Sequence, residues 1–286
     1  MLNLSVKFND QQLELLDIRK SRQLYKLCSE LKLHSLIGAT TCESELVSIV
    51  KKYGISDMCD FTGLHISVSQ KLTDCIVTVL YKYPRLRSRI CFIGSRKGCL
   101  DSMSKLISAD DGVIRSFGIQ HILTGENARQ IGQAITEMLS ESDDSYEANV
   151  LAQAITTCGL IDGIMVDERD FGTKNIWKKQ IELQASVFMK HSPKGCASVD
   201  SIIYHEIGHL LDFLCDVSED DQLLAEYNGL SKSEIKSKLS GYAATSIAEF
   251  IADGFSEYMS SPNPRDLSKH VVATIDRCYQ KLDNNI

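Results

Sequence analysis

The sequence lacks a long hydrophobic run, and no apolar stretch in its 286 residues approaches the roughly 18 residues of a membrane-spanning helix. The segment Met1–Lys7 contains neither a basic stretch followed by an apolar one nor a cleavage site, so no secretory signal is expected. We therefore expect a protein that is cytoplasmic where it is made and that has no membrane partner.

Closely paired cysteines are also missing. The chain has 10 cysteines, but none of them forms a C-x-x-C pair. Several lie within apolar helical or strand patterns, as Cys75, Cys91 and Cys215 do. We interpret the cysteines as reduced, buried small hydrophobes in a reducing compartment.

A strong excess of positive charge is absent as well. The net charge is −7, and 24% of the residues are charged, which indicates a mildly acidic protein. A local group of basic residues within 85–97 is expected to flank a strand and to be solvated, so nucleic acid is not predicted as the main ligand. With 43% hydrophobic residues, the chain has ample apolar material for a core.

The most informative feature is the segment His205–His209, which reads His-Glu-Ile-Gly-His. Residues four apart share one face of a helix, so both imidazoles would face the same ligand, with Glu206 between them. Apolar residues at helical spacing surround the motif and predict a buried helix, with Gly208 leaving room for close packing. Buried ionisable groups are costly unless they bind something, and the pattern is typical of a zinc peptidase. The alternative is a pair of histidines that are hydrogen-bonded within a core.

A zinc ion in a hydrolytic site takes three protein ligands, so a third donor is needed. A second buried helix is predicted over residues 246–259, with Ser246 as its N-cap and two prolines after its end. Glu249 and Asp253 lie four residues apart on this helix and share one strip of its surface. A solvated acidic face is the alternative interpretation.

The segment Ser240–Phe255 resembles the third-ligand helix of zincin metallopeptidases of the anthrax lethal factor type, which also occur in phage and mobile-element proteins. The resemblance implies that Glu249 is the third zinc ligand and that the hydroxyl of Tyr242 points at the site. Asp253 stands where the family usually has glutamate. The implied fold is α+β and helix-rich, with a small twisted sheet over the zinc helix. Weaker similarity extends the resemblance to residues from about 60 to 262.

These residues suggest a mechanism. Glu206 is predicted to act as general base on zinc-bound water, whose pKa zinc lowers to about 7, and to pass the proton to the leaving amine. Zinc and Tyr242 would stabilise the oxyanion. Asp212 and Asp253 are candidates for orienting the ligand histidines. His191, which precedes a Pro-Lys-Gly turn, is a candidate for the cleft.

The other histidines, at positions 34, 65, 121 and 270, are expected to be ordinary surface or core polar residues. Cys196 lies close to the zinc motif in sequence and is a candidate inhibitory thiolate.

The chain is predicted to contain a small helical region at residues 1–55 and a zincin-like catalytic domain at 56–286. The catalytic domain is expected to carry a helical insertion at about 99–158, whose purpose the sequence does not indicate.

Within the first region, a helix is predicted over residues 11–37. A capping box of Thr40 and Glu43 is predicted to open a second helix, which Gly54 ends.

In the catalytic domain, a helix is predicted over residues 65–83, with strands at 90–93 and 163–167. Residues 183–189 fit either an edge strand that could bind an extended substrate or a helix that leads to the His191 loop.

Three functions are compatible with these features. The first is a zinc endopeptidase with one zinc ion per chain and a protein or peptide substrate. The second is a virion-associated structural protein of a phage or mobile element, with capsid or other virion proteins as partners. The third is an effector peptidase that is delivered into another cell and cleaves host proteins.

Overall fold

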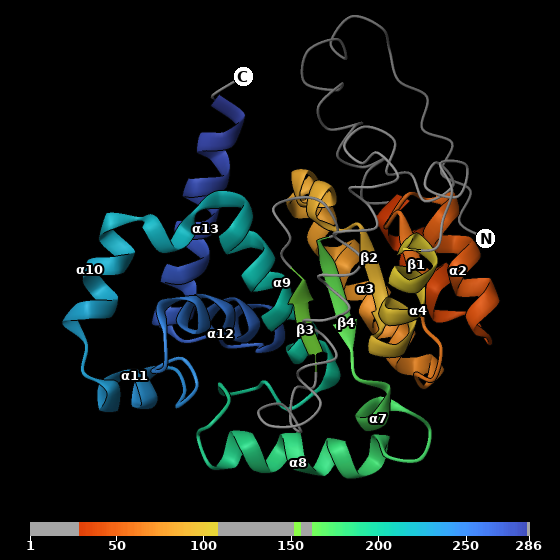
Figure 1. Ribbon diagram of the computed structural model, residues 1–286. Helices are drawn as coiled ribbons and strands as arrows, with labels where there is room; N and C mark the ends of the chain where they lie inside the picture. Colours follow the sequence, from red (N-terminus) through yellow and green to blue (C-terminus); the bar gives the residue numbers. More distant parts are fainter. Residues whose placement is uncertain (1–28, 108–151, 156–161, 285–286) are drawn as a thin grey trace, which may run out of the picture.

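The computed structural model describes residues 29–107, 152–155 and 162–284 (Figure 1). Residues 29–38 form the first described helix. The other helical elements are α2 (Glu43–Lys52), α3 (Ile66–Lys82), the 3-10 helix η1 (Pro84–Arg89), α4 (Arg96–Ile107), α7 (Glu168–Phe171), α8 (Ile176–Phe188), α9 (Val199–Cys215), the 3-10 helix η2 (Val217–Glu219), α10 (Asp221–Gly229), α11 (Lys232–Lys238), α12 (Ile247–Ser260) and α13 (Asp266–Asn284). The strands are β1 (Met58–Asp60), β2 (Phe92–Ser95), β3 (Ala152–Ile155) and β4 (Gly163–Val166). The described chain is therefore α+β and helix-rich, as predicted.

The strands form one 4-stranded sheet in the order β1-β2-β4-β3. β1 pairs with β2 and β2 pairs with β4 in parallel, whereas β3 pairs with β4 antiparallel. β2 and β4 match the two predicted strands to within about two residues, a usual uncertainty for element ends. The two outer strands, β1 and β3, were not predicted.

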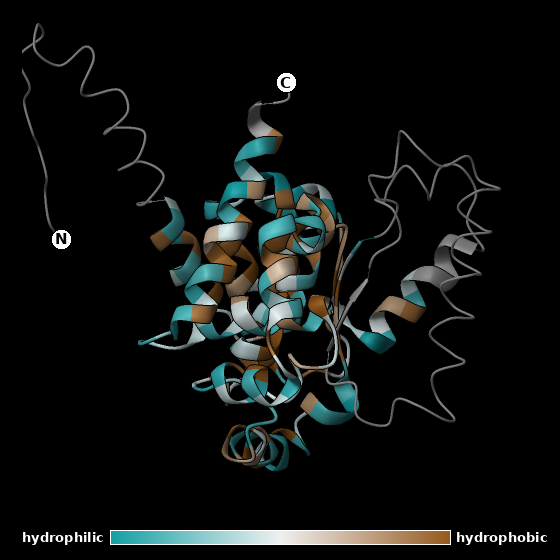
Figure 2. Ribbon diagram, turned by 90° about the vertical axis from the view of Figure 1, so that its left-hand side faces the viewer, coloured by the Kyte–Doolittle hydropathy of each residue, from teal (hydrophilic) through white to brown (hydrophobic). Residues whose placement is uncertain are grey.

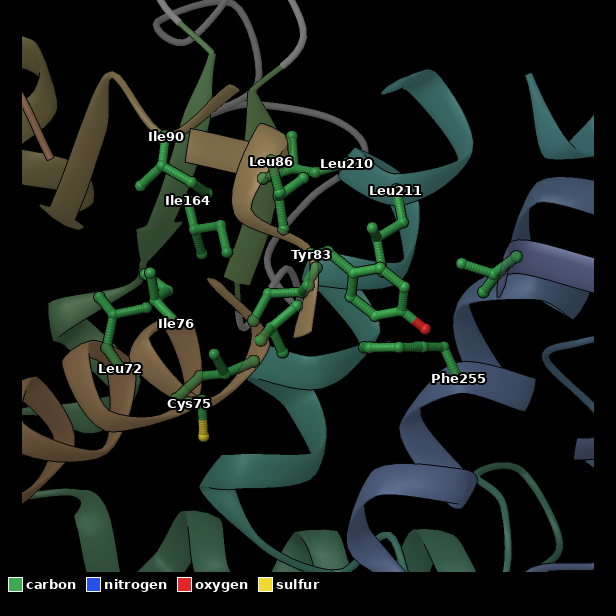
Figure 3. Close-up of a cluster of buried hydrophobic side chains, with 14 of the residues drawn as sticks. Leu72, Cys75, Ile76, Tyr83, Leu86, Ile90, Ile164, Leu210, Leu211 and Phe255 are labelled. Carbon is green, nitrogen blue, oxygen red and sulfur yellow. The ribbon is translucent and has the colours of Figure 1, made fainter. Parts of the chain in front are cut away.

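The core lies between the sheet and the helices α3 and α9. Hydrophobic residues concentrate inside the helical body (Figure 2). In Figure 3, Leu72 and Ile76 of α3 lie near Ile164 of β4, and Leu211 of α9 lies near Tyr83 and Phe255. The apolar positions predicted for the helix over 65–83 are buried or partly buried, so that prediction is confirmed.

The helices α9 and α12 cross at very short distance. A Cβ atom added at Gly208 would lie 2.7 Å from the Cα atom of Ala252. Real carbon atoms need about 3.5 Å or more, so only glycine permits this crossing. The predicted close approach at Gly208 is confirmed, and it brings the predicted zinc motif against α12.

The N-terminal helices share their core with the rest of the chain. Leu33 in the first described helix and Leu46 in α2 belong to the same buried cluster as Leu210 of α9. The described part of the predicted region 1–55 thus packs directly onto the predicted catalytic domain. Residues 11–28 of the predicted first helix lie outside the described residues.

The predicted capping box at the start of α2 is wrong. Cys42 is the N-cap and makes no side-chain capping bond. The hydroxyl of Thr40 instead donates to the carbonyl of Ile37 at 2.7 Å. The carboxylate of Glu43 accepts from the backbone N–H of Phe61 at 3.1 Å and so ties α2 to the end of β1.

The predicted insertion at about 99–158 includes residues of the sheet layer at both of its ends. α4 contacts β1, β2 and β4, and β3 is hydrogen-bonded to β4. These elements therefore belong to the body of the fold. The residues of the predicted insertion at 108–151 and 156–158 lie outside the described residues.

Residues 183–188 are helical and belong to α8, so the edge-strand interpretation of 183–189 is wrong and the helix alternative is confirmed. α8 runs across the bottom of the view in Figure 1 and leads into the loop that carries His191.

Within the described residues, no helix combines the length and the apolar character needed to cross a membrane.

Candidate metal centre

α9 presents two histidine rings on one face. His205 and His209 are four residues apart, and their ring centroids lie 4.8 Å from each other with the planes nearly perpendicular. Their Nε2 atoms are 3.2 Å apart. A capping box of Ser198 and Ser201 begins this helix, and Asp216 ends it in the left-handed conformation with a φ of 50°. The helix therefore has well-defined ends around the two imidazoles.

α12 adds a carboxylate to the two imidazoles. The hydroxyl oxygen of Ser246 accepts a hydrogen bond from the N–H of Glu249 at 3.2 Å, which confirms Ser246 as the N-cap. Oε2 of Glu249 lies 3.0 Å from Nε2 of His205 and 3.4 Å from Nε2 of His209. Two helices that are far apart in sequence thus converge on one point.

The spacing of the three donor atoms fits a metal ion. A tetrahedral zinc ion with bonds of about 2.0–2.1 Å holds its ligand atoms about 3.3 Å apart. The observed separations of 3.0, 3.2 and 3.4 Å surround this value. Oε2 of Glu249 is buried and, within the described residues, has no hydrogen-bond partner of good geometry. A cation held by His205, His209 and Glu249 would satisfy this carboxylate oxygen, so the three residues form a possible metal-binding triad.

The electrostatics of the triad also suit a cation. Burial acts to lower the pKa of His205, but the carboxylates of Asp253 and Glu249 outweigh it and raise the pKa well above its usual value. Burial acts to raise the pKa of Glu249, but its close approach to His205 and His209 brings the pKa down to about 2. Both shifts show that positive charge is favoured at this position.

Asp253 contacts the ring nitrogen of His205 that does not face the other two members of the triad. Nδ1 of His205 lies 2.8 Å from one carboxylate oxygen of Asp253, which leaves Nε2 facing the other donors. The other carboxylate oxygen accepts a hydrogen bond from the hydroxyl of Ser240. Asp253 therefore contacts a ligand histidine as predicted, whereas the role of Ser240 was missed. The oxygen of Ser240 also accepts from the N–H of Ala243 at 2.8 Å, and this fastens the loop that carries Tyr242.

Asp212 lies near the end of α9 and binds the turn that follows it. Its carboxylate accepts from the N–H of Ser218 at 2.7 Å and so fastens the turn after α9. Within the described residues it makes no hydrogen bond to His205 or His209, although the charge of His209 acts to lower its pKa, so the orienting role stays a prediction. Burial raises the pKa of Asp212, and the hydrogen bond to Ser218 opposes that rise. Its position, three residues after His209, put it on the correct face but closer to the helix end than the rings.

Tyr242 lies beside the triad. Its ring centroid is 5.6 Å from that of His205, with an angle of 31° between the planes. Burial and the carboxylates of Glu249 and Glu206 raise the pKa of the Tyr242 hydroxyl above its usual value. The hydroxyl consequently stays protonated and can donate a hydrogen bond. Glu206 is buried in α9 and sits between the two histidines in sequence.

The His191 loop packs against the Tyr242 loop. The N–H of Gly241 donates to the carbonyl of Lys190 at 2.7 Å, and the N–H of Tyr242 donates to the carbonyl of His191 at 3.1 Å. The ring of His191 is exposed and its centroid lies 5.6 Å from that of Tyr242. His191 therefore packs against Tyr242, which in turn packs against His205 of the triad.

Cys196 is buried and packs against α12. Its sulfur lies 3.4 Å from the hydroxyl oxygen of Ser256, which also donates to the carbonyl of Ser201 at 2.6 Å. Burial raises the pKa of the Cys196 thiol to about 12, which favours the thiol over the thiolate. The hypothesis of an inhibitory thiolate has no support here. The other described cysteines are free as well. Cys75, Cys99, Cys215 and Cys278 are buried as expected, whereas Cys42 is exposed and Cys59 and Cys91 are only partly buried.

The remaining described histidines lie outside the triad. The ring of His65 caps α3 by accepting from the N–H of Ser67 at 3.2 Å. His34 contacts Asp74, and His270 contacts Glu226. His121 lies outside the described residues. The ordinary structural role expected for these histidines is confirmed for the three that the structure describes.

Comparisons of the chain with protein-family models, with curated proteins and with solved structures gave no match.

Proposed function

We propose that this protein is a zinc-dependent endopeptidase with a zincin-like fold. The observation that carries the proposal is the spacing of the two Nε2 atoms and the Glu249 oxygen, at 3.0–3.4 Å, beside a buried glutamate on the same helix as the histidines. Two imidazoles and one carboxylate form the ligand set of many catalytic zinc sites, which keep a further position for water.

When bound, zinc supplies an activated water and Lewis-acid polarisation of the scissile carbonyl. His205, His209 and Glu249 would hold it. Asp253 keeps the proton of His205 on Nδ1, so that Nε2 stays available as a ligand.

Glu206 performs the proton transfers in this proposal. Its carboxylate accepts a proton from the attacking water and delivers it to the amine that leaves. The peptide oxygen gains negative charge as the carbonyl is attacked, and the protonated hydroxyl of Tyr242 donates a hydrogen bond to it. The loop of Tyr242 is held in place through Ser240 and Asp253.

The sheet offers a place for an extended substrate. Among the described strands, β3 is at the edge of the sheet and pairs only with β4. β3 also contacts α9, the helix of the two histidines. A polypeptide that adds to β3 by main-chain hydrogen bonds would run past the triad. β3 is therefore the proposed substrate-binding strand, in place of residues 183–189, for which the edge-strand interpretation is wrong.

No feature of the described residues specifically favours a virion-associated structural role or delivery into another cell. Capsid proteins as partners and host proteins as targets therefore remain predictions from the resemblance.

The test compares the metal content and the proteolytic activity of three purified proteins. These are the parent chain, Glu206→Gln, and Glu219→Gln as a control at an exposed glutamate. We expect one zinc ion per chain in all three, and cleavage of an unfolded general substrate by the parent and by the control only. Protein purified without chelators that contains no zinc would refute the site, and zinc without cleavage by the parent would count against a general endopeptidase.

A further inference from the structure

α8 exposes a row of large apolar residues in addition to the ones it buries. Its inner side buries Leu183 and Lys179, and the ammonium group of Lys179 forms ion pairs with Asp170 at 3.0 Å and with Glu182 at 2.8 Å. Its outer side carries large apolar residues with high exposed fractions: Trp177 (79%), Ile181 (69%), Phe188 (89%) and, just after the helix, Met189 (65%). Surface helices normally keep their large apolar residues on the buried side only.

This exposure is concentrated on one helix. The other large hydrophobic residues that are exposed in the described chain are spread over several elements, as is normal for a protein surface. A contiguous apolar patch marks an interaction surface, and Trp, Phe and Met are enriched in protein interfaces. Trp177 is the only tryptophan of the chain. In Figure 2, α8 lies at the bottom of the molecule with hydrophobic residues on its ribbon.

The spacing of this patch is that of a helix–helix seam. Trp177, Ile181, Gln184 and Phe188 follow one another at intervals of four, three and four residues. Such intervals place side chains along one stripe of a helix, as in the contact line of two paired helices. We call these four residues together with Met189 the α8 stripe.

We propose that the α8 stripe pairs with the α8 stripe of a second copy of this chain, in an antiparallel, two-fold symmetric contact. A two-fold interface uses the same patch on both copies. In an antiparallel contact, each residue of the stripe must therefore fit the residue at the equivalent distance on the other side of the stripe's midpoint. The α8 stripe does so about a midpoint between Glu182 and Leu183. Trp177 then faces Phe188 of the second copy, and Ile181 faces Gln184.

The area of the α8 stripe suits a weak contact of this kind. Aromatic side chains each bury on the order of 150–250 Å², and the aliphatic ones somewhat less. With the observed exposures, the stripe can contribute at most roughly 600 Å² per copy, which is below the about 800 Å² per partner of a standard interface and fits a dimer that dissociates on dilution. Lys178 and Glu182 border the stripe, carry opposite charges and lie within 3.7 Å of each other in one helix. The antiparallel arrangement brings Glu182 of the two copies together beside the two-fold axis, where each carboxylate is paired with Lys178 and Lys179 of its own helix.

The test measures the oligomeric state of the full chain by sedimentation velocity and follows the emission of Trp177. The parent chain should sediment as a dimer of the 31.9 kDa chain and dissociate on dilution. Trp177 emission should shift to longer wavelength as it dissociates. The variant Ile181→Glu/Phe188→Glu keeps Trp177 as the reporter and should be a monomer with long-wavelength emission at every concentration. The control Lys269→Glu at an exposed lysine of α13, away from α8, changes the net charge by the same amount and should behave as the parent.

Several outcomes would overturn the proposal. A monomeric parent at about 100 µM would exclude even a dimer of micromolar affinity. A monomer whose Trp177 resists a soluble quencher would indicate that another part of the same chain covers the stripe. Emission that changes only when an unfolded protein is added would identify the stripe as a docking site for other polypeptides. If the double variant fails to fold, as judged by circular dichroism, the dilution experiment on the parent still decides the question.

Discussion

The close crossing of α9 and α12 makes Gly208 the most informative position to perturb. In Gly208→Ala, the new methyl group would lie 2.7 Å from the Cα atom of Ala252, about 1 Å short of normal carbon contact. A backbone atom cannot rotate away, so the two helices must move apart. Because Glu249 lies on α12 three residues before Ala252, this movement carries its carboxylate away from His205 and His209.

Two measurable effects follow. Overpacking lowers the free energy of unfolding by about 1–3 kcal/mol, and the better helix propensity of alanine raises it by up to about 1 kcal/mol. The metal-free variant should therefore lose about 1–2 kcal/mol of unfolding free energy. A misplacement of about 1 Å within a site can cost up to 100-fold. We expect the zinc affinity to fall 10–100-fold.

Chemical denaturation of the metal-free proteins gives the first quantity, and competition with a chromophoric chelator gives the second. Gly229→Ala serves as the control, because a Cβ atom there meets nothing within 4 Å. That control should keep the parent affinity. If Gly208→Ala bound zinc as tightly as the parent and unfolded at the same denaturant concentration, the close crossing and its link to the triad would both be refuted.

Three further predictions concern chemistry, stability and the metal. Tyr242→Phe should lower kcat about 100–1,000-fold and leave KM and zinc content unchanged, because only the hydrogen bond to the developing oxyanion is lost; a proportional loss of zinc would contradict this role. Arg265→Ala leaves the fully buried carboxylate of Glu257 without its ion pair, which at present has an N–O distance of 2.6 Å, and should cost about 3–5 kcal/mol in denaturant unfolding. Lys269→Ala, which removes an exposed ion pair, should cost less than about 1 kcal/mol, and equal losses in both variants would refute the argument from burial. Removing zinc with a chelator should lower the unfolding free energy by about 2.7 kcal/mol relative to protein at a free zinc concentration of 100 times Kd, and an unchanged melting temperature would argue against binding to the native state.

The ligand histidines could be predicted from sequence because their arrangement is local. A spacing of four residues on a helix places His205 and His209 on one face, whatever the rest of the chain does. The prediction of Glu249 needed more information than local spacing, since only its place on a second helix and the resemblance distinguished it from other glutamates. Its approach to the histidines depends on the crossing at Gly208, for which the sequence offered a small residue but no partner.

Residues whose role depends on distant contacts could not be predicted. Ser240 is one of many serines, and its hydrogen bond to Asp253 exists only because a loop folds back over α12. β3 reads Ala-Gln-Ala-Ile and is four residues long, so its pairing with β4 leaves little trace in the sequence pattern. The hydrogen bond from the N–H of Ser218 to Asp212 could not be predicted either, because it depends on how the chain turns after α9.

Asp253 divides its two carboxylate oxygens between a ligand histidine and the serine that fastens the Tyr242 loop. The proposed metal position and the Tyr242 loop are therefore linked through one side chain, and we expect them to become ordered together. Loading the cation should draw His205 into place and, through Asp253 and Ser240, reduce the freedom of the loop. A freshly synthesised chain would then acquire its cofactor and its ordered catalytic loop in a single maturation step, and the availability of zinc in the cell would set when activity begins.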